Sequence, residues 1–404
     1  MLLSACDMQA PEATSTPEPA NAPDFAAEAQ RVARDSIIVD THIDVPMRIH
    51  AQPQDVSQAT ESGDFDYPRA VAGGLNAPFM SIYTPAELEA AGGSKALADE
   101  LIDAVENMVA TAPEKFAIAL SPADVRAHFE KGIISLPMGM ENGSPIEGNL
   151  TNLKHFYDRG IRYITLAHGL SNHISDSSYD TNRQWDGLSD FGVEVVKEMN
   201  RFGIMVDVSH LSDDAVREVL EVSTSPVIAS HSSARHFTPG WERNMGDELI
   251  KALADNGGVI SINFGSGFIS KAARDYDEPR WAAARAWMAE NPGKTYADVA
   301  SEWLPGYIAE VGPYPFASLD DVLDHFDHVV ALTGINHVGI GSDYDGVGDS
   351  LPTGLKDVSS YPNLVEGLLE RGYSEEDIRK ILGENVLRVW EEVEARKLKK
   401  QESG

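Results

Sequence analysis

Eight short apolar runs are the feature that most constrains how this chain can fold. Each run is rich in β-branched residues, and helical or loop-like segments separate the runs from Ser36 onward. The runs are apolar throughout, without alternating polar residues, which is typical of parallel strands covered by helices. We expect strands at Ser36–Asp40, Ala77–Tyr83, Ile133–Met140, Arg162–Ala167, Ile204–Val208, Pro226–Ser230, Val259–Phe264 and His337–Gly341.

The segments between the runs carry helix start signals. Ser121 precedes Pro122, Ser212 precedes two aspartates, and Ser318 stands three residues before Asp321. Eight parallel strands linked by helices predict an α/β fold, a (β/α)8 barrel of the TIM type. The alternative, an open doubly wound sheet, would need a glycine-rich phosphate loop after its first strand, and the sequence has none there.

We expect a single barrel domain over residues 35–398. Residues 265–317 form an insertion between the seventh and eighth strands that is too long for a plain loop, so a helical excursion near the functional site is predicted. The tryptophans of this insertion, Trp281, Trp287 and Trp303, would form a small core of its own. Residues 361–393 predict C-terminal helices, one of them starting at Ser374.

Residues 1–34 are predicted to be a separate N-terminal segment. Cys6, the single cysteine, ends the sequence Leu-Ser-Ala-Cys, which resembles the lipobox of bacterial lipoproteins, whose cysteine carries a lipid. The proline-rich stretch from Asp7 to about Asp24 is typical of a flexible tether. Because only Met-Leu-Leu precedes the box, either the start is truncated or the match is accidental. A lipoprotein would lie on the periplasmic side of a bacterial cell envelope, whereas an accidental match leaves a cytoplasmic location open.

Charge and hydropathy exclude two classes of protein. The chain has 64 acidic and 32 basic residues and a formal charge of −32, so it lacks the basic surface that nucleic-acid binding requires. No run reaches the ~18 consecutive apolar residues of a membrane-spanning helix. Membrane association is therefore expected only through a lipid on Cys6, and one cysteine excludes an internal disulfide.

Histidines and carboxylates gather where the predicted strands end. In a barrel of this class, functional groups emerge at the carboxyl ends of the strands, around one mouth. A lone histidine after a strand is more often a packed or capping residue than a functional one. Together, however, His42, Asp44, Glu141, His210 and His231 supply the nitrogen and oxygen ligands that zinc takes. Glu141 could bridge two ions, and Zn²⁺, Mn²⁺ and Co²⁺ all stay open.

For other polar residues, the neighbouring sequence does not indicate one particular role. Asp207 lies inside its predicted strand. Its role is either to hydrogen-bond a metal ligand or to be a buried, hydrogen-bonded acid. His173 and His236 follow strand ends by several residues and could line the cleft. His325 and His328 lie beside core positions of the helix predicted after the insertion, and we interpret them as surface or packing residues.

Six segments at the strand ends form a recognisable set. They are, in order, Val39-Asp-Thr-His-Ile-Asp44, Gly139-Met-Glu-Asn-Gly143, Arg162-Tyr-Ile-Thr-Leu-Ala-His168, Gly203-Ile-Met-Val-Asp-Val-Ser-His210, Val227-Ile-Ala-Ser-His-Ser-Ser233 and Gly339-Ile-Gly-Ser-Asp-Tyr-Asp-Gly346. With these segments the chain resembles the membrane dipeptidase (renal dipeptidase) family of zinc metallopeptidases, over about residues 35 to 393. The resemblance implies a barrel of the metal-dependent hydrolase kind, in agreement with the eight expected strands, and a dinuclear zinc hydrolase that cleaves dipeptides.

The resemblance implies two Zn²⁺ ions per chain. His42 and Asp44 would hold one ion, His210 and His231 the other, and Glu141 would bridge them. The animal members of the family have disulfides and a glycolipid anchor. This chain departs from them, because it has a single cysteine and no apolar C-terminal tail.

Three further residues receive roles from the same resemblance. His168 matches the family's histidine that contacts the substrate and the oxyanion. Arg243, in Trp241-Glu-Arg-Asn244, matches the arginine that binds the terminal carboxylate of the substrate. Asp343 matches the aspartate that handles protons, and the long insertion leaves substrate choice open.

These inferences predict hydrolysis of a dipeptide amide bond by a hydroxide that bridges two metal ions, with recognition of the free C-terminal carboxylate. Two alternatives stay open. One is another amidohydrolase acting on N-acyl amino acids, cyclic amides or lactones, and the other is a lipoprotein that binds peptides or metal without turnover. The expected partners are a dipeptide or a similar small substrate and, as a further prediction, a second copy of the chain in a homodimer.

Overall fold

A closed barrel of eight parallel strands forms the centre of the molecule. The computed structural model describes residues 25–294 and 298–401, so the lipobox-like segment with Cys6 and the tether lie outside the described residues. The strands follow one another around the barrel in the order β1-β10-β9-β8-β7-β6-β5-β2. The predicted fold class is therefore confirmed. The barrel strands are β1 (Ile38–Ile43), β2 (Leu75–Tyr83), β5 (Met138–Glu141), β6 (Ile161–Thr165), β7 (Met205–Asp207), β8 (Ile228–Ala229), β9 (Val259–Ile262) and β10 (Val338–Ile340).

The prediction of one continuous strand over residues 133–140 is wrong. Two strands, β4 (Ile134–Leu136) and β5, occupy this segment, with Pro137 between them. β4 pairs in parallel with β3 (Phe116–Ile118) in a separate two-stranded sheet. Proline has no N–H to donate to a strand ladder, so the pairing is interrupted at Pro137 and the chain changes sheet there. The other seven expected strands overlap barrel strands and differ from them by a few residues at the ends.

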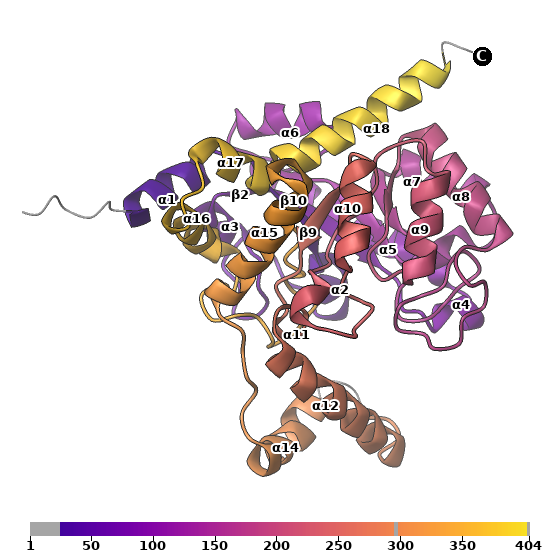
Figure 1. Ribbon diagram of the computed structural model, residues 1–404, viewed down its shortest axis with the longest axis vertical. Helices are drawn as coiled ribbons and strands as arrows, with labels where there is room; N and C mark the ends of the chain where they lie inside the picture. The colour runs from indigo at the N-terminus through magenta and orange to yellow at the C-terminus, as the bar shows by residue number, and fades with distance from the viewer. Residues whose placement is uncertain (1–24, 295–297, 402–404) are drawn as a thin grey trace, which may run out of the picture.

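Helices cover the outside of the barrel (Figure 1). The serine start signals at Ser121, Ser212 and Ser318 are confirmed, because each side chain accepts a hydrogen bond from a backbone N–H of the first helical turn. The helices up to the insertion, with α15 after it, are α1 (Phe25–Arg34), α2 (Val45–Ala51), α3 (Tyr67–Gly73), α4 (Leu88–Ala91), α5 (Ser94–Thr111), α6 (Pro122–Phe129), α7 (Thr151–Asp158), α8 (Asp190–Phe202), α9 (Asp213–Val222), α10 (Asp247–Asp255) and α15 (Leu319–Thr333).

The C-terminal helices close one end of the barrel. α16 (Tyr361–Glu370) and α17 (Glu375–Arg379) lead into α18 (Asn385–Gln401), whose Trp390 is fully buried and lies 5.3 Å from Phe79 of β2, centroid to centroid. Phe79 in turn lies 5.4 Å from the ring of Tyr163 inside the barrel. Packed side chains therefore fill the end of the barrel that α18 covers. The functional groups are expected at the opposite end.

The insertion is helical, as predicted. It comprises α11 (Ser266–Ile269), α12 (Lys271–Glu290), a π-helical turn (Val299–Trp303) and α14 (Leu304–Val311). Figure 1 shows α12 and α14 projecting from the end of the molecule opposite to α18. The expectation of a tryptophan core is only partly right: Trp303 stacks on Tyr307 at 4.8 Å, but Trp281 is 39% exposed. No helix of the described residues is both long and apolar enough to cross a membrane.

Candidate metal centre

The five residues predicted to bind metal meet at the open end of the barrel. His42 lies at the end of β1 and Asp44 directly after it, Glu141 ends β5, and His210 and His231 follow β7 and β8. These side chains come from parts of the chain up to 189 residues apart, and none of the five residues is more than 7% exposed. Closure of the barrel brings the strand ends together, and the carboxyl ends of all eight strands share one mouth.

The carboxylate of Glu141 lies between two groups of donors. Its Oε2 lies 3.4 Å from Nε2 of His42, and Nε2 of His42 is 3.5 Å from Oδ2 of Asp44. Its Oε1 lies 3.1 Å from Nε2 of His210 and 3.3 Å from Nε2 of His231. Each oxygen of one carboxylate therefore faces a different set of ligand-type atoms.

These donors fit metal ions. Bonds of about 2.0–2.1 Å in a tetrahedral shell put neighbouring ligand atoms about 3.3 Å apart, close to the separations around Glu141. Nε2 of His42 and Oδ1 of Asp44 are buried and have no hydrogen-bond partner in the described residues. Buried polar atoms are normally paired, so these two unpaired atoms are available to bind an ion.

Hydrogen bonds to Nδ1, the ring nitrogen that faces away from Glu141, fix the orientation of two of these histidines. The hydroxyl of Tyr163 donates to the carbonyl of Thr41 at 3.0 Å, so it accepts from Nδ1 of His42 at 2.9 Å. In the neutral ring, Nε2 of His42 therefore carries the lone pair that a metal ligand needs. Tyr163 was not singled out by sequence reasoning, because nothing in the chain near it reveals that it reaches His42 across the barrel.

His231 is oriented in the same way through a serine. Ser230 donates its hydroxyl to Oδ2 of Asp207 at 2.6 Å and lies 2.7 Å from Nδ1 of His231. Nδ1 of His231 therefore carries the proton, and Nε2 faces Glu141 with its lone pair. Asp207 is fully buried, so the prediction of a buried acid that supports a ligand describes it well.

Unusual backbone conformations accompany the strand ends at this mouth. Asn142 after β5, His210 after β7 and Asp343 after β10 have φ angles of 82°, 71° and 63°, which non-glycine residues rarely adopt. Such conformations tend to occur where function needs a side chain aimed in a particular direction.

The electrostatic environment suits ligation. Burial alone would raise the pKa of Glu141, but His42, His168, His210 and His231 around it lower that pKa well below its usual value. Burial and then the charge of Arg243 lower the pKa of His210 well below the ordinary range, and burial and then the charge of His42 do the same for the pKa of His231. Both rings are therefore neutral near pH 7, with a lone pair available for a metal.

His42 differs from the other two histidines. Burial would lower its pKa, but Tyr163, Glu141 and Asp44 raise it well above the usual value. Its protonated form is the one stabilised by the two carboxylates. A metal ion would take the place of that proton, since a cation between the same carboxylates satisfies them equally.

His168 and Asp343 lie beside the five ligand-type residues. Nε2 of His168 is 3.4 Å from Oε1 of Glu141, and the His168 ring packs edge-on against Tyr83 with centroids 4.7 Å apart. Oδ2 of Asp343 accepts a 2.7 Å hydrogen bond from Asn263. Burial and then the carboxylates Asp44 and Glu141 raise the pKa of Asp343 to about 7, against the lowering effect of His42.

A glycine allows Asp343 and Asp44 to approach each other. A Cβ on Gly346 would lie 2.2 Å from Oδ1 of Asp343 and 2.2 Å from Oδ2 of Asp44. No side chain fits there, so Gly346 is required for close packing of the two carboxylates.

Arg243 is a buried cation without a carboxylate partner. The residue is 2% exposed, and it donates to Oγ of Ser232 and to the carbonyl of His231, both at 2.8 Å. Its Nε has no hydrogen-bond partner, and within the described part of the chain no carboxylate oxygen lies within 4.0 Å of its guanidinium. An unpaired buried charge is costly, so this arrangement favours an anionic ligand that is not part of the chain.

The start of the insertion borders the segment that carries Arg243. The guanidinium of Arg243 lies 5.1 Å from the ring centroid of Phe268 in α11, and that ring is 5.0 Å from the ring of Trp241. Arg274 of α12 places its guanidinium 4.2 Å from the same tryptophan ring. The insertion was expected near the functional site, and its first two helices lie there. Sequence reasoning missed Phe268 and Arg274.

The remaining histidines lie apart from the metal centre. His325 is buried and uses both ring nitrogens, one accepting from the N–H of Ala234 and the other donating to the carbonyl of Ile269. Its packing role is therefore confirmed. His173 pairs with Glu89 at 2.7 Å, and the ring of His236 stacks on His328 with centroids 4.4 Å apart.

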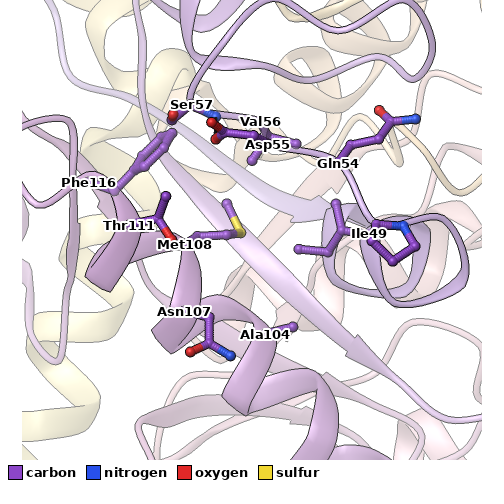
Figure 2. A pocket seen from close by; sticks show the side chains of 11 residues that line it. Ile49, Gln54, Asp55, Val56, Ser57, Ala104, Asn107, Met108, Thr111 and Phe116 are labelled. Carbon is purple, nitrogen blue, oxygen red and sulfur yellow. Dashed lines mark hydrogen bonds between the residues drawn. The ribbon is translucent and has the colours of Figure 1, made fainter.

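A separate cavity of about 510 Å³ lies between α2, α5 and β3. Figure 2 shows Ile49, Met108 and Phe116 among the side chains that line it. Its lining contains none of the eight residues predicted for the metal centre and the substrate. The chemistry of this protein is therefore expected at the barrel mouth.

A family comparison identifies the enzyme class. The model of the membrane dipeptidases, peptidase family M19, matches residues 26–404. The chain belongs to the membrane dipeptidase family. It is thus a dipeptidase-type metallopeptidase, and the metal that this class requires has a matching donor cluster at the barrel mouth.

Solved structures agree with the family assignment. The probable dipeptidase PvdM from Pseudomonas aeruginosa is 27% identical, with a TM-score of 0.78, over 92% of this chain and 99% of that one. A metallo peptidase from Rhodobacter sphaeroides, liganded with a phosphinate mimic of the dipeptide L-Ala-D-Ala, is 25% identical, with a TM-score of 0.72, over 89% of this chain and 100% of that one. This membrane dipeptidase family member therefore shares its fold with both proteins over about nine tenths of its length.

Proposed function

We propose that this family member hydrolyses dipeptides with two Zn²⁺ ions bound at the barrel mouth. The observation that carries the proposal is the position of Glu141, whose two oxygens face different donor sets. His42 and Asp44 would hold one ion, and His210 and His231 the other. Imidazole and carboxylate donors without a thiolate suit Zn²⁺, although Mn²⁺ and Co²⁺ accept the same ligands.

Two groups of the chain, His168 and Asp343, would assist the chemistry that bound metal ions supply. Two metal ions bound here would lower the pKa of a shared water and polarise the scissile carbonyl. Nε2 of His168, which faces the cluster, would donate to the oxygen of that carbonyl as negative charge develops on it. Oδ1 of Asp343 is available because Asn263 occupies Oδ2, so Oδ1 would take a proton from the nucleophilic water and later deliver it to the leaving amine.

We assign recognition of the substrate's free carboxylate to Arg243. Its unpaired Nε–H and the second hydrogens of its terminal nitrogens are three donors that the described chain does not use. A carboxylate can take two of them side by side. This contact would fix the distance between the C-terminus and the cleaved bond, so dipeptides would be preferred over longer peptides. The dipeptide mimic bound to the Rhodobacter sphaeroides relative supports a substrate of this size.

The proposal is tested by metal removal and reconstitution. Chelated protein is titrated with Zn²⁺ and assayed on a dipeptide, a tripeptide, an N-acyl amino acid and a lactone. We expect dipeptide hydrolysis to recover as two equivalents of Zn²⁺ bind, with little turnover of the other compounds. Faster turnover of N-acyl amino acids or lactones would instead favour another amidohydrolase, and binding of dipeptide without turnover would favour a binding protein.

We further propose that Cys6 carries a lipid that attaches the enzyme to a bacterial envelope membrane, on the periplasmic side. The support is the Leu-Ser-Ala-Cys sequence and the proline-rich stretch after it. Cys6→Ser should move the protein from the membrane fraction to the soluble fraction, while a protein that is soluble with Cys6 intact would contradict the anchor. A homodimer stays a prediction for sedimentation measurements.

A further inference from the structure

A second group of metal-ligand side chains lies outside the barrel mouth. It consists of His236 in the 3-10 turn η2 (Arg235–Phe237), Asp247 at the start of α10 and His328 in α15, and one ligand atom from each lies within 4.8 Å of the others. The group shares no residue with the metal centre. From these three residues we propose a further binding site for a transition-metal ion, with Zn²⁺ as its probe.

The donor set has the composition that such ions prefer. Two imidazole nitrogens and one carboxylate oxygen are ligands for Zn²⁺, and a water would complete a four-coordinate shell. Nε2 of His328 lies 2.9 Å from Oδ1 of Asp247, slightly less than the ~3.3 Å between neighbouring ligand atoms in a tetrahedral zinc shell. A small opening of this pair would admit the ion.

A hydrogen-bonded pair at the start of a helix explains only part of this arrangement. His328 and Asp247 could simply link α15 to α10, but His236 has no part in that link. The His236 ring lies nearly parallel to the His328 ring, at an interplanar angle of 25°. Neither of its ring nitrogens makes a hydrogen bond within the described residues. His236 therefore contributes an unused donor beside a pair that already has ligand geometry.

The neighbouring His325 shows what a packing histidine looks like in this fold. It lies one helical turn before His328, and both of its ring nitrogens are engaged with backbone groups. It is fully buried, whereas His236 is exposed and His328 and Asp247 are partly exposed. An ion from solvent can therefore reach the three proposed ligands, and His325 has no donor to offer.

An ion at this site would fasten the segment that leads to Arg243. η2 is held from one side by Arg235, which donates to both oxygens of Asp213 at 2.5 and 2.7 Å. The proposed ion would hold the same turn from the other side, against α10 and α15. Residues 235–247 would then open less often, because opening would also break metal bonds.

Equilibrium dialysis of the full chain against buffered Zn²⁺, in an excess of Mg²⁺, tests the site. We expect the double variant His236→Ala, His328→Ala to bind one Zn²⁺ per chain fewer than the wild type. The matched control is His50→Ala, which removes another exposed histidine close to an acidic side chain and should bind as much as the wild type. Because the readout is a difference, it does not depend on how many ions the barrel mouth holds.

Two outcomes would overturn the inference. Equal Zn²⁺ binding by the wild type and the double variant would show that the three side chains do not form a site. Equal losses in the double variant and in His50→Ala would mean that the acidic surface collects the ion, although Mg²⁺ should then compete for it. Hydrogen exchange gives an independent measurement: Zn²⁺ should slow exchange over residues 235–247 in the wild type and not in the double variant.

Discussion

If Arg243 binds the free carboxylate of the substrate, as proposed, removal of its guanidinium should abolish the preference for that carboxylate. In the variant Arg243→Met, a side chain of similar length keeps the apolar contact with Phe268 and loses the charge and all five N–H donors. The two hydrogen bonds to Ser232 and to the His231 carbonyl are also lost. The experiment therefore needs a control for structural changes in the surrounding loop.

The size of the effect follows from the contact that the geometry allows. A bidentate carboxylate would receive two hydrogen bonds from a charged donor, each contributing about 1.5–3 kcal/mol. The lower limit, about 3 kcal/mol for the pair, corresponds to a loss on the order of 10²-fold in kcat/KM. An amidated dipeptide lacks the charge, so Arg243→Met should change its kcat/KM far less.

The assay is a cycle of two enzymes and two substrates. The wild type and Arg243→Met are each measured on one dipeptide and on its C-terminal amide, with both enzymes loaded with the same metal. Arg235→Met serves as the control, since Arg235 lies on the same loop but is paired with Asp213. Equal losses on both substrates would refute carboxylate recognition by Arg243, because only a structural effect acts on the amide and the acid alike.

Three further predictions concern the metals, the proton and the stability. In the background His236→Ala, His328→Ala, which lacks the proposed outer site, Glu141→Gln should lose most of the bound metal, measured by elemental analysis, whereas the exposed neighbour Glu147→Gln should keep it; two ions retained in Glu141→Gln would refute the bridge. Asp343→Asn should keep the metal but lower kcat by about 10²–10⁴-fold, the usual contribution of acid–base catalysis, and an unchanged kcat would remove Asp343 from the mechanism. Burial raises the pKa of Asp345 to about 7, and the nearby Asp64 adds to this effect while Arg48 opposes it. Between about pH 4 and pH 7 the Asp345 carboxyl is therefore protonated in the folded chain and ionised in the unfolded chain. The free energy of unfolding should therefore fall as pH rises from about 4 to 7, by up to roughly 4 kcal/mol for this group, and Asp345→Asn should flatten that slope in denaturant titrations of metal-free protein. An unchanged slope would show that Asp345 is not the group responsible.

The strand count and the residues at the mouth could be predicted from the chain because both depend on local patterns. A parallel strand inside a barrel is buried on both faces, so its sequence is apolar over its whole length and can be recognised without knowledge of its neighbours. The one failure among the strands, at Pro137, has the opposite cause. Two strands of different sheets follow each other so closely that their apolar residues form one run.

The supporting contacts of the metal centre could not be predicted in the same way. Tyr163 orients His42 from a strand more than a hundred residues away, and no local pattern distinguishes it from a packed tyrosine. Likewise, Phe268 and Arg274 look like ordinary residues of a helical insertion. Their position beside Trp241 follows from how the insertion leaves β9, which depends on contacts distant in sequence.

The sequence by itself predicted the barrel, the helical insertion and the five residues that meet at the barrel mouth, His42, Asp44, Glu141, His210 and His231. Apolar runs, the polar residues that follow them and helix-capping residues are features of short stretches of chain, so they can be recognised from consecutive residues. The tertiary structure alone decided which oxygen of Glu141 faces which histidines and that Arg243 is buried without a counter-ion. It also decided that His236, Asp247 and His328 meet. Each of these facts is a distance between residues remote in sequence, and only closure of the barrel and packing of its helices set such distances.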